Sequence, residues 1–323
     1  IPGQSGANAV SIDFFPAFLA DAWLSGRIAA IHALSDLWAS GVRPTSALAM
    51  VTIPDGSMTR QSEMLHQVLS GAVYEFSMAN TVLVGGHTTN GEELAIGFTI
   101  LGETQPRSND RLPLSKANLR PGQELILTKS LGTGIILAAH AQGLAPARSM
   151  TAAIDMMLHS NQRASEIAAV HDLSAGTDVT GFGLAGHLLE LCQQSGVSVE
   201  LWLAALPLIP GAAPLIDAGI RSSLFDENLA AVQGFLFAED GVEINDLQQQ
   251  RVGDSETPPE ALRPSLQSRC EAVFDPQTSG GLLLGVDPVH AGKIIGELAA
   301  AGYRDATIVG RVTDSNKTGI TFR

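Results

Sequence analysis

Three aspartates lie among apolar or glycine-rich residues, where a carboxylate can serve as a metal ligand. Asp13 interrupts the apolar run VSIDFF, and Asp36 lies in the helical pattern that follows. Aspartate is disfavoured inside a strand, and a buried carboxylate needs a partner or a metal ion. Taken alone, each of these two is more simply explained as an Asp that faces water. Asp178 precedes Thr-Gly-Phe-Gly, a predicted helix start, so it is either an N-cap or an ionised carboxylate suited to Mg²⁺.

A Gly-Gly-His sequence follows a short apolar segment and could bind an anion. Residues 81–84 predict a strand, and Gly85, Gly86 and His87 come directly after it. Paired glycines let a ligand approach the backbone, whose N–H groups bind anions. An ordinary turn capped by His87 explains the same residues.

Two further glycine-rich junctions occur in the second half of the chain. The segment 127–134 (LTKSLGTG) ends a predicted strand and opens a helix, a geometry that suits anions, but it lacks the P-loop pattern GxxxxGK[ST]. Lys129 within it is either a phosphate contact or a lysine lying over a tight turn. The segment 274–282 (FDPQTSGGL) predicts a rigid turn into a strand, with a structural role.

The elements that must position these residues alternate between strand and helix patterns. In the first part we predict strands at 10–15, 46–53, 81–84 and 93–101, and helices at 24–40 and 59–79, the latter capped by Thr59. In the second part we predict strands at 124–129, 197–203, 281–286, 306–312 and 318–322, and helices at 132–142, 150–170, 181–195 and 288–301. The polar stretch 103–121 reads as a linker, and the acidic, Gln-rich stretch 239–268 as a surface insertion. This order predicts two α/β domains, residues 1–112 and 117–323.

Composition excludes several classes of function. The chain of 323 residues carries a net charge of −14 and has no basic run, which argues against nucleic-acid and anionic-membrane partners. No apolar stretch is long enough to span a bilayer, and the start, which lacks a Met, does not resemble a signal peptide. The two cysteines, Cys192 in an apolar helical pattern and Cys270 among polar residues, form no metal or disulfide pattern. A reducing cytoplasm fits, with Cys192 buried and Cys270 exposed.

The order of these motifs resembles the selenophosphate synthetase family. DFF, GRIAA, GGH, LTKSLGTG, TDVTGFG and DPQTSGG follow one another from about residue 10 to the C-terminus. The resemblance implies an α/β, α+β fold like that of aminoimidazole ribonucleotide synthetase. An N-terminal sheet domain would form a homodimer and a C-terminal α/β sandwich would follow it. It also implies ATP with Mg²⁺ as cofactors, and conversion of ATP, selenide and water to selenophosphate, AMP and phosphate.

The resemblance also assigns roles to residues of this chain. Asp13, Asp36 and Asp178 match metal-binding positions. Residues that match or lie near the nucleotide site are Gly85, Gly86, His87, Thr177 and Asn228.

Several positions depart from the family pattern. The family's catalytic Cys or selenocysteine and its Lys would precede residue 10, and nothing in IPGQSGANAV supplies them. The catalytic residues therefore stay unassigned, and we expect the 323-residue chain alone to show little turnover. Ile12 and His32 replace a Thr and an Asn, and GIRSSLFDEN lacks a Gly-Gly-Thr. Three alternatives stay open: a domain of a fusion with a flavin oxidoreductase, another ATP-dependent enzyme of the superfamily, and a non-catalytic nucleotide-binding domain.

Overall fold

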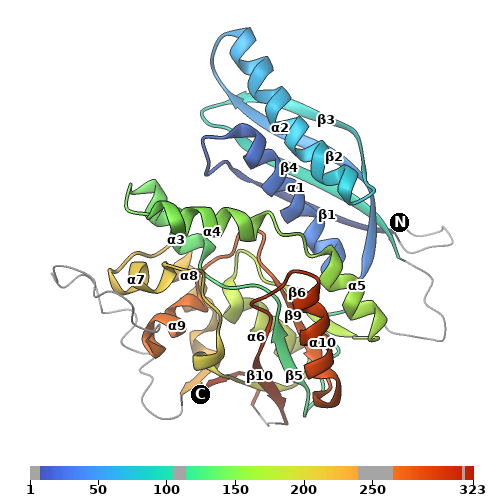
Figure 1. Cartoon of the computed structure of the whole chain (residues 1–323), viewed down its shortest axis with the longest axis vertical. Coiled ribbons are helices and arrows are strands. Elements are labelled where there is room, and N and C mark those ends of the chain that lie inside the picture. Colours follow the sequence, from blue (N-terminus) through green and yellow to red (C-terminus); the bar gives the residue numbers. More distant parts are fainter. Residues whose placement is uncertain (1–7, 105–113, 239–264, 315–316) are drawn as a thin grey trace. The chain divides into compact units, whose positions relative to one another are not determined.

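The computed structural model describes residues 8–104, 114–238, 265–314 and 317–323. Contacts divide the chain into two compact units (Figure 1). The first comprises Ile1–Pro113 with Met157–Glu166, and the second comprises Leu114–Met156 with Ile167–Arg323. Most of the predicted linker and insertion lies outside the described residues.

The first unit is a four-stranded sheet with two helices on one face. The strands, in sheet order, are β1 (Asn8–Pro16), β4 (Ala95–Thr104), β2 (Val42–Pro54) and β3 (Val82–Gly91). β1 and β2 run antiparallel to β4, and β3 runs parallel to β2. Helices α1 (Ala22–Ala39) and α2 (Met58–Met78) bury their apolar sides against the sheet.

The two helices of this unit touch through glycines. A Cβ atom added at Gly26 would lie 2.1 Å from the carbonyl oxygen of Val68, and one at Gly71 would lie 2.1 Å from that of Trp23. Only glycine permits so close an approach. Ser57 caps α2 by accepting a hydrogen bond from the Arg60 N–H, so the predicted N-cap at Thr59 is wrong by two residues.

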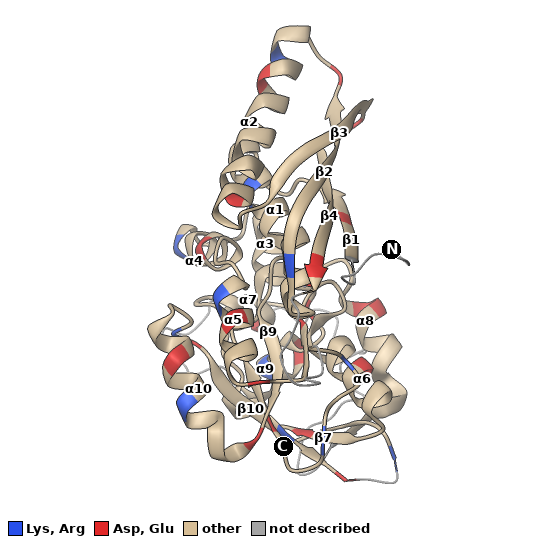
Figure 2. Cartoon of the chain, turned by 90° about the vertical axis from the view of Figure 1, so that its right-hand side faces the viewer, with Lys and Arg blue, Asp and Glu red and all other residues tan. Residues whose placement is uncertain are grey.

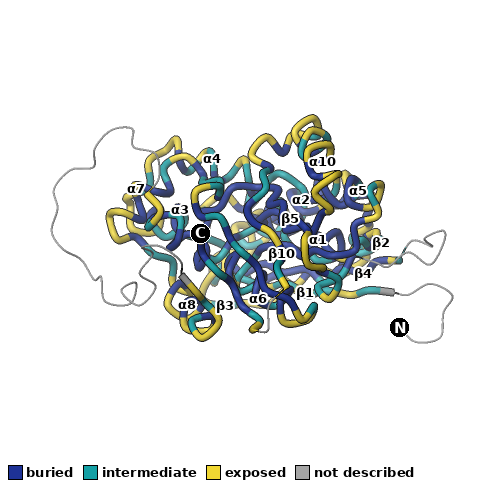
Figure 3. Tube along the Cα trace, turned by 90° about the horizontal axis from the view of Figure 1, so that it is seen from below, coloured by how far each residue is buried: buried dark blue, intermediate teal, exposed yellow. Residues whose placement is uncertain are grey.

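The second unit is built on a seven-stranded mixed sheet. In sheet order the strands are β6 (Ala175–Asp178), β9 (Leu282–Val286), β5 (Glu124–Leu127), β10 (Thr307–Thr313), β7 (Ser198–Leu201), β11 (Ile320–Phe322) and β8 (Leu236–Ala238). Its helices include α3 (Thr133–Ala141), α6 (Gly183–Ser195), α7 (Ala212–Asp217), α8 (Phe225–Val232), α9 (Leu266–Ala272) and α10 (Pro288–Ala300). Its strands are largely buried, whereas exposed residues recur along α8 and α10 (Figure 3).

One predicted helix is two in the structure. The segment 150–170 divides into α4 (Ala147–Met157) and α5 (Gln162–Val170). Ser160 accepts a hydrogen bond from the Gln162 N–H, and Asn161 donates from its amide to Ser35. Serine and asparagine compete with the helix backbone in this way, which ends one helix and starts the next.

Other expectations also changed. Short elements with little periodicity, namely β6, β8, α7, α8 and α9, were not predicted. Cys270 is buried, contrary to prediction, because α9 turns it into the core of the second unit; Cys192 is buried as predicted. Burial raises the pKa of both thiols to about 12, so both stay protonated near neutral pH.

Candidate functional site

Asp13 and Asp36 lie at one contact between β1 and α1. The Ser11 hydroxyl donates a hydrogen bond to Asp36 Oδ2. His32 lies one turn before Asp36 on α1, and its Nε2 is 3.7 Å from Asp13 Oδ1. The ring of Phe15 packs edge-on against His32, with centroids 5.2 Å apart. The two carboxylates and the imidazole therefore form one half-buried cluster on the helix-covered side of the sheet.

The Gly-Gly-His segment lies within a strand rather than in a turn after one. β3 continues to Gly91, and Gly86 and His87 pair with Ala49 and Met50 of β2. A Cβ atom at Gly86 would lie 2.3 Å from the Ala49 carbonyl oxygen, so the glycine serves close strand packing. Gly85 pairs with Leu48 and is exposed.

His87 and Asp13 lie on opposite faces of this sheet. His87 pairs with Met50, and Met50 pairs with Gly97 of β4, so these three residues lie on one face of the sheet. Asp13 pairs with Phe98, the next residue along β4. Successive residues of a strand point to opposite faces. The sheet of the first unit therefore separates the His87 side chain from the aspartate cluster.

In the second unit, three distant segments meet at one edge of the sheet. β5 and β6 both run antiparallel to β9, so Leu127 and Asp178 end where Leu282 begins. The Thr128 N–H donates to the Leu282 carbonyl over 3.0 Å, and the Thr128 hydroxyl accepts from the Leu282 N–H over 2.8 Å. The Val179 N–H donates to the Gly281 carbonyl. These contacts join the LTKSLGTG, TDVTGFG and DPQTSGG motifs.

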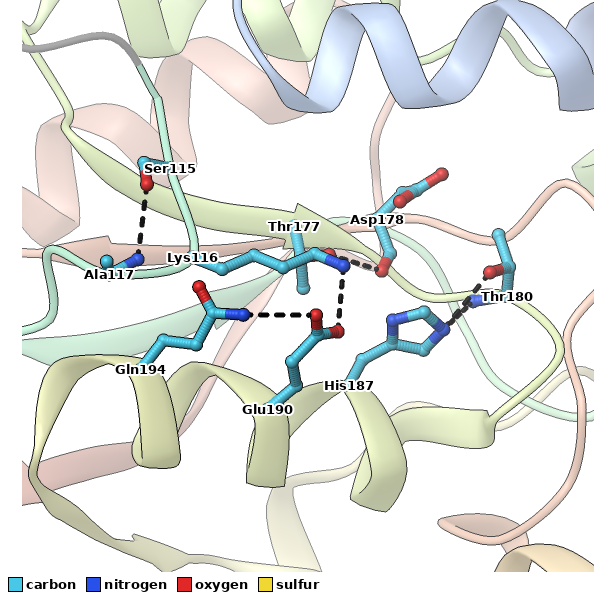
Figure 4. Close-up of polar contacts among 9 residues, drawn as sticks. All are labelled: Ser115, Lys116, Ala117, Thr177, Asp178, Thr180, His187, Glu190 and Gln194. Carbon is cyan, nitrogen blue, oxygen red and sulfur yellow. Dashed lines mark hydrogen bonds and ion pairs between the residues drawn. The ribbon is translucent and has the colours of Figure 1, made fainter. Parts of the chain in front are cut away.

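Asp178 is the last residue of β6 and is 4% exposed. It is not a helix N-cap, because α6 begins at Gly183 with Phe182 in the capping position. Thr177 is buried beside it, and its hydroxyl donates to the Asp178 carbonyl over 3.1 Å. In Figure 4 the Asp178 carboxylate points away from α6.

Two side chains hold the turn that follows Asp178. His187 of α6 reaches back to Thr180, whose backbone N–H donates to its Nε2 over 3.0 Å (Figure 4). Asn228 of α8 donates from its amide to the carbonyls of Gly181 and Phe274, both over 2.9 Å. The Asn228 amide nitrogen therefore donates its hydrogen bonds to the backbone. His187 lies four residues after the TDVTGFG motif, and its role follows only from the turn that the structure shows.

Lys129 is buried, at 3% exposure, so it is not a lysine that lies over the turn with its ammonium in water. Its Nζ donates to the Ser279 carbonyl over 2.9 Å. Burial lowers the pKa of Lys129 to about 7, and the charge of Asp178 partly offsets that effect.

The helix start predicted to bind an anion is occupied by the protein's own side chains. Gln277 Oε1 accepts from the N–H groups of Gly132 and Thr133, and Asp275 Oδ2 accepts from the N–H of Ile135. Burial raises the pKa of Asp275 to about 7, although the hydrogen bonds from Ile135 and Gln277 oppose the rise. The predicted structural role of the DPQTSGG turn agrees with this capping, and the prediction that 127–134 is open to an anion is wrong.

The acidic residues suit Mg²⁺ bound together with a phosphate. Among the described residues, no three His, Cys, Asp or Glu side chains gather closely enough to enclose a metal ion. Mg²⁺, however, usually takes only one or two carboxylates and completes its shell with water and phosphate oxygens. The Asp13–Asp36 cluster and Asp178 supply oxygen ligands of this kind.

Comparisons with known proteins agree on the family. Residues 2–104 and 120–323 match the N-terminal and C-terminal domains of AIR synthase related proteins. The selenide, water dikinase of Pelobacter propionicus is 36% identical over 304 residues, covering 94% of this chain and 79% of the relative. The chain belongs to the selenide, water dikinase family. The selenide, water dikinase of Myxococcus xanthus is 33% identical, covering 99% of this chain and 82% of the relative.

Solved structures of more distant proteins share the fold of this dikinase-family chain. The thiamine-monophosphate kinase of Stenotrophomonas maltophilia has a TM-score of 0.68 at 17% identity, and the match covers 99% of this chain and 86% of the kinase chain. The hydrogenase maturation protein HypE in complex with ATP also has a TM-score of 0.68 at 17% identity, covering 99% and 82%. The predicted α/β fold and family are confirmed.

Two predicted exclusions concern surfaces. No described helix combines the length and apolarity that a membrane crossing requires. In the view of Figure 2, Lys and Arg occur singly among acidic residues rather than as a stripe.

Proposed function

We propose that this chain uses ATP and water to convert selenide to selenophosphate, with AMP and phosphate as the other products. The observation that carries the proposal is the 36% identity to a selenide, water dikinase over 94% of the chain. The acidic cluster at β1 and α1 and the buried Asp178 support it, because cleavage of phosphoanhydride bonds builds charge that cations must offset.

Asp13, Asp36 and Asp178 are the residues proposed to hold Mg²⁺ with the ATP phosphates. Bound Mg²⁺ neutralises phosphate charge and orients the phosphates. His32 and Ser11 fix the carboxylates of the first unit, while Thr177 stays with the backbone of Asp178.

We propose two different roles for the five residues expected near the nucleotide. Thr177 and Asn228 are buried and donate hydrogen bonds to backbone carbonyls, so we propose that they shape the nucleotide site by holding its turns. Gly85, Gly86 and His87 are exposed on β3, and His87 lies on the face opposite Asp13. We therefore propose that these three residues contact the nucleotide away from the phosphates that the aspartates hold.

The experiment is a pair of measurements on the full chain. ATP binding is titrated by calorimetry with and without Mg²⁺, and AMP formation is followed with and without selenide. We expect Mg²⁺-dependent ATP binding that Asp178→Asn and Asp36→Asn weaken. The exposed-site variants Asp226→Asn and Asp55→Asn serve as matched controls and should bind as wild type. Equal ATP binding by all four variants would remove the proposed metal role. If selenide does not increase the rate of AMP formation and another acceptor does, selenide is not the substrate and that proposal is wrong.

We further propose that a second copy of the chain covers the open face of the first unit. This open face consists of the exposed apolar residues Val10, Ile12, Phe14, Leu48, Met50 and Val82. They come from β1, β2 and β3, on the side of the sheet opposite α1 and α2. A contiguous apolar surface of this kind usually marks an interface.

The oligomeric state tests that proposal directly. Ile12 is 60% exposed, so Ile12→Asp places a charge on the open face without disturbing the core. We expect light scattering to show a dimer for wild type and a monomer for the variant, with equal helix content by circular dichroism. Val289→Asp, at an 82% exposed site on α10, is the control and should stay dimeric. A monomeric wild type would refute the proposal.

A further inference from the structure

Lys129 is a buried cation to which the proposed function gives no task. It is 3% exposed, and its ammonium donates to a backbone carbonyl, that of Ser279, over 2.9 Å. A neutral donor could make the same hydrogen bond. Burying a charge is far more unfavourable than burying a neutral polar group, unless an opposite charge compensates it.

The opposite charge is that of Asp178. Lys129 follows the end of β5 and Asp178 ends β6, on either side of the start of β9. Ser279 precedes Gly280, where an added Cβ atom would lie 2.1 Å from the carbonyl oxygen of Val179, the residue after Asp178. The backbone that accepts the ammonium hydrogen bond therefore packs directly against the segment that carries Asp178. The pair is thus built at the edge of the sheet where the three glycine-rich motifs meet.

The backbone around Lys129 holds it in place. A Cβ atom at Gly281 would lie 2.6 Å from the Lys129 backbone nitrogen, so the strands pack here without spare room. Ser279, which accepts the ammonium hydrogen bond, is fully buried and has a φ of 51° in the left-handed region. A non-glycine residue holds that conformation only where its surroundings enforce it.

We propose that Lys129 is a positioning residue that serves as the internal counter-ion of Asp178 and competes with divalent cations for that carboxylate. The inference rests on the proposed function, in which Asp178 holds Mg²⁺ together with ATP. Without metal, the ammonium balances the Asp178 charge. When a divalent cation binds, the two positive charges repel each other, and Lys129 sets the cation concentration at which Asp178 is occupied.

This role predicts an effect of unusual sign. A lysine that only supports the fold would, on removal, loosen the site and weaken metal binding. Removing a counter-ion relieves repulsion and tightens metal binding. Charges a few ångströms apart in a protein interact strongly enough to change a binding constant about tenfold or more.

The test measures Mn²⁺ binding to the full chain by electron paramagnetic resonance of the free ion, with ATP present and selenide absent. The pH is held at about 5.5, well below the usual pKa of a lysine. The variants are Lys129→Met, which keeps the length and removes the charge, and Lys129→Gln, which keeps a donor for Ser279. Lys293→Met is the control, since Lys293 is 70% exposed on α10. Asp178→Asn identifies the binding event that belongs to Asp178.

We expect Asp178→Asn to abolish one binding event and both Lys129 variants to tighten that event about tenfold or more, with Lys293→Met unchanged. Loss of this event in Asp178→Asn, with unchanged or weaker binding in both Lys129 variants, would overturn the counter-ion role and leave the proposed metal site intact. Equal Mn²⁺ binding by wild type and Asp178→Asn would overturn both proposals. If Lys129→Met does not fold by circular dichroism, Lys129→Gln decides.

Discussion

The buried carboxylate of Asp275 should make the second unit less stable as pH rises. Burial raises the pKa of Asp275 from its usual 3.8 to about 7 in the folded chain. Between these values the folded state binds more protons than the unfolded state, so the free energy of unfolding falls as pH increases. Asp275→Asn keeps an oxygen for the Ile135 N–H and has no proton to lose, so it lacks this contribution.

The size of the effect follows from the two pKa values. The full difference corresponds to about 4 kcal/mol at about 1.4 kcal/mol per pH unit. The isoelectric point near 4.9 makes acidic conditions unsuitable. Between about pH 5.5 and about pH 8.5 the wild type should lose about 2 kcal/mol from this group. The free energy of unfolding of Asp275→Asn minus that of wild type should therefore rise by about 2 kcal/mol over this range.

The assay is urea unfolding of the second unit at several pH values. Trp202 lies in that unit, and replacing Trp23 and Trp38 by Phe makes its fluorescence the only tryptophan signal. The exposed Asp226→Asn is the control and should show a constant difference from wild type. A difference that stays constant for Asp275→Asn, or falls with pH, would show that Asp275 is ionised in the folded chain throughout, and would refute the reasoning.

Three further changes test the packing that positions the site. Gly71→Ala would place a methyl group 2.1 Å from the Trp23 carbonyl oxygen, and should lower the free energy of unfolding of the first unit by more than about 2 kcal/mol in a thermal melt. Ser57→Ala removes the α2 N-cap and should lower the free energy of unfolding of the first unit by about 1 kcal/mol, whereas Thr59→Ala should change it by less than about 0.5 kcal/mol. Equal losses in the two variants would show that Ser57 is not the sole N-cap. Asn228→Ala removes the donor from two backbone carbonyls and should lower the free energy of unfolding of the second unit by about 2 kcal/mol, measured by urea with Trp202; no loss would show that these carbonyls find other donors.

The longer elements could be predicted because they carry strong local patterns. Alternation along VSIDFF and the apolar repeat of residues 24–40 correspond closely to β1 and α1. The short elements could not be predicted, because a four-residue strand such as β6 has room for no repeat. The extension of β3 through Gly85 and Gly86 was not predicted either, since glycines after a strand usually end it, whereas here Gly86 allows close pairing with β2.

The candidate site was predicted in part, and the reason lies in distance along the chain. The motifs and the aspartates could be recognised locally, but their partners are remote: Gln277 caps a helix that begins at Thr133, and Asn228 holds Gly181 to Phe274. No spacing rule connects such residues, because the sheet order β6-β9-β5 brings them together.

In that arrangement, groups of the protein itself already bond to the glycine-rich junctions that could otherwise bind a ligand. The start of α3 has the geometry of an anion site, yet Gln277 and Asp275 occupy its N–H groups, so a phosphate would have to displace buried protein hydrogen bonds. Gly86 of β3 is used for strand packing, and His187 and Asn228 hold the turn after Asp178. The motifs thus serve mainly as one another's partners. The proposed function accordingly assigns the phosphates to Asp178 and to the Asp13–Asp36 cluster, through cations rather than through backbone N–H groups.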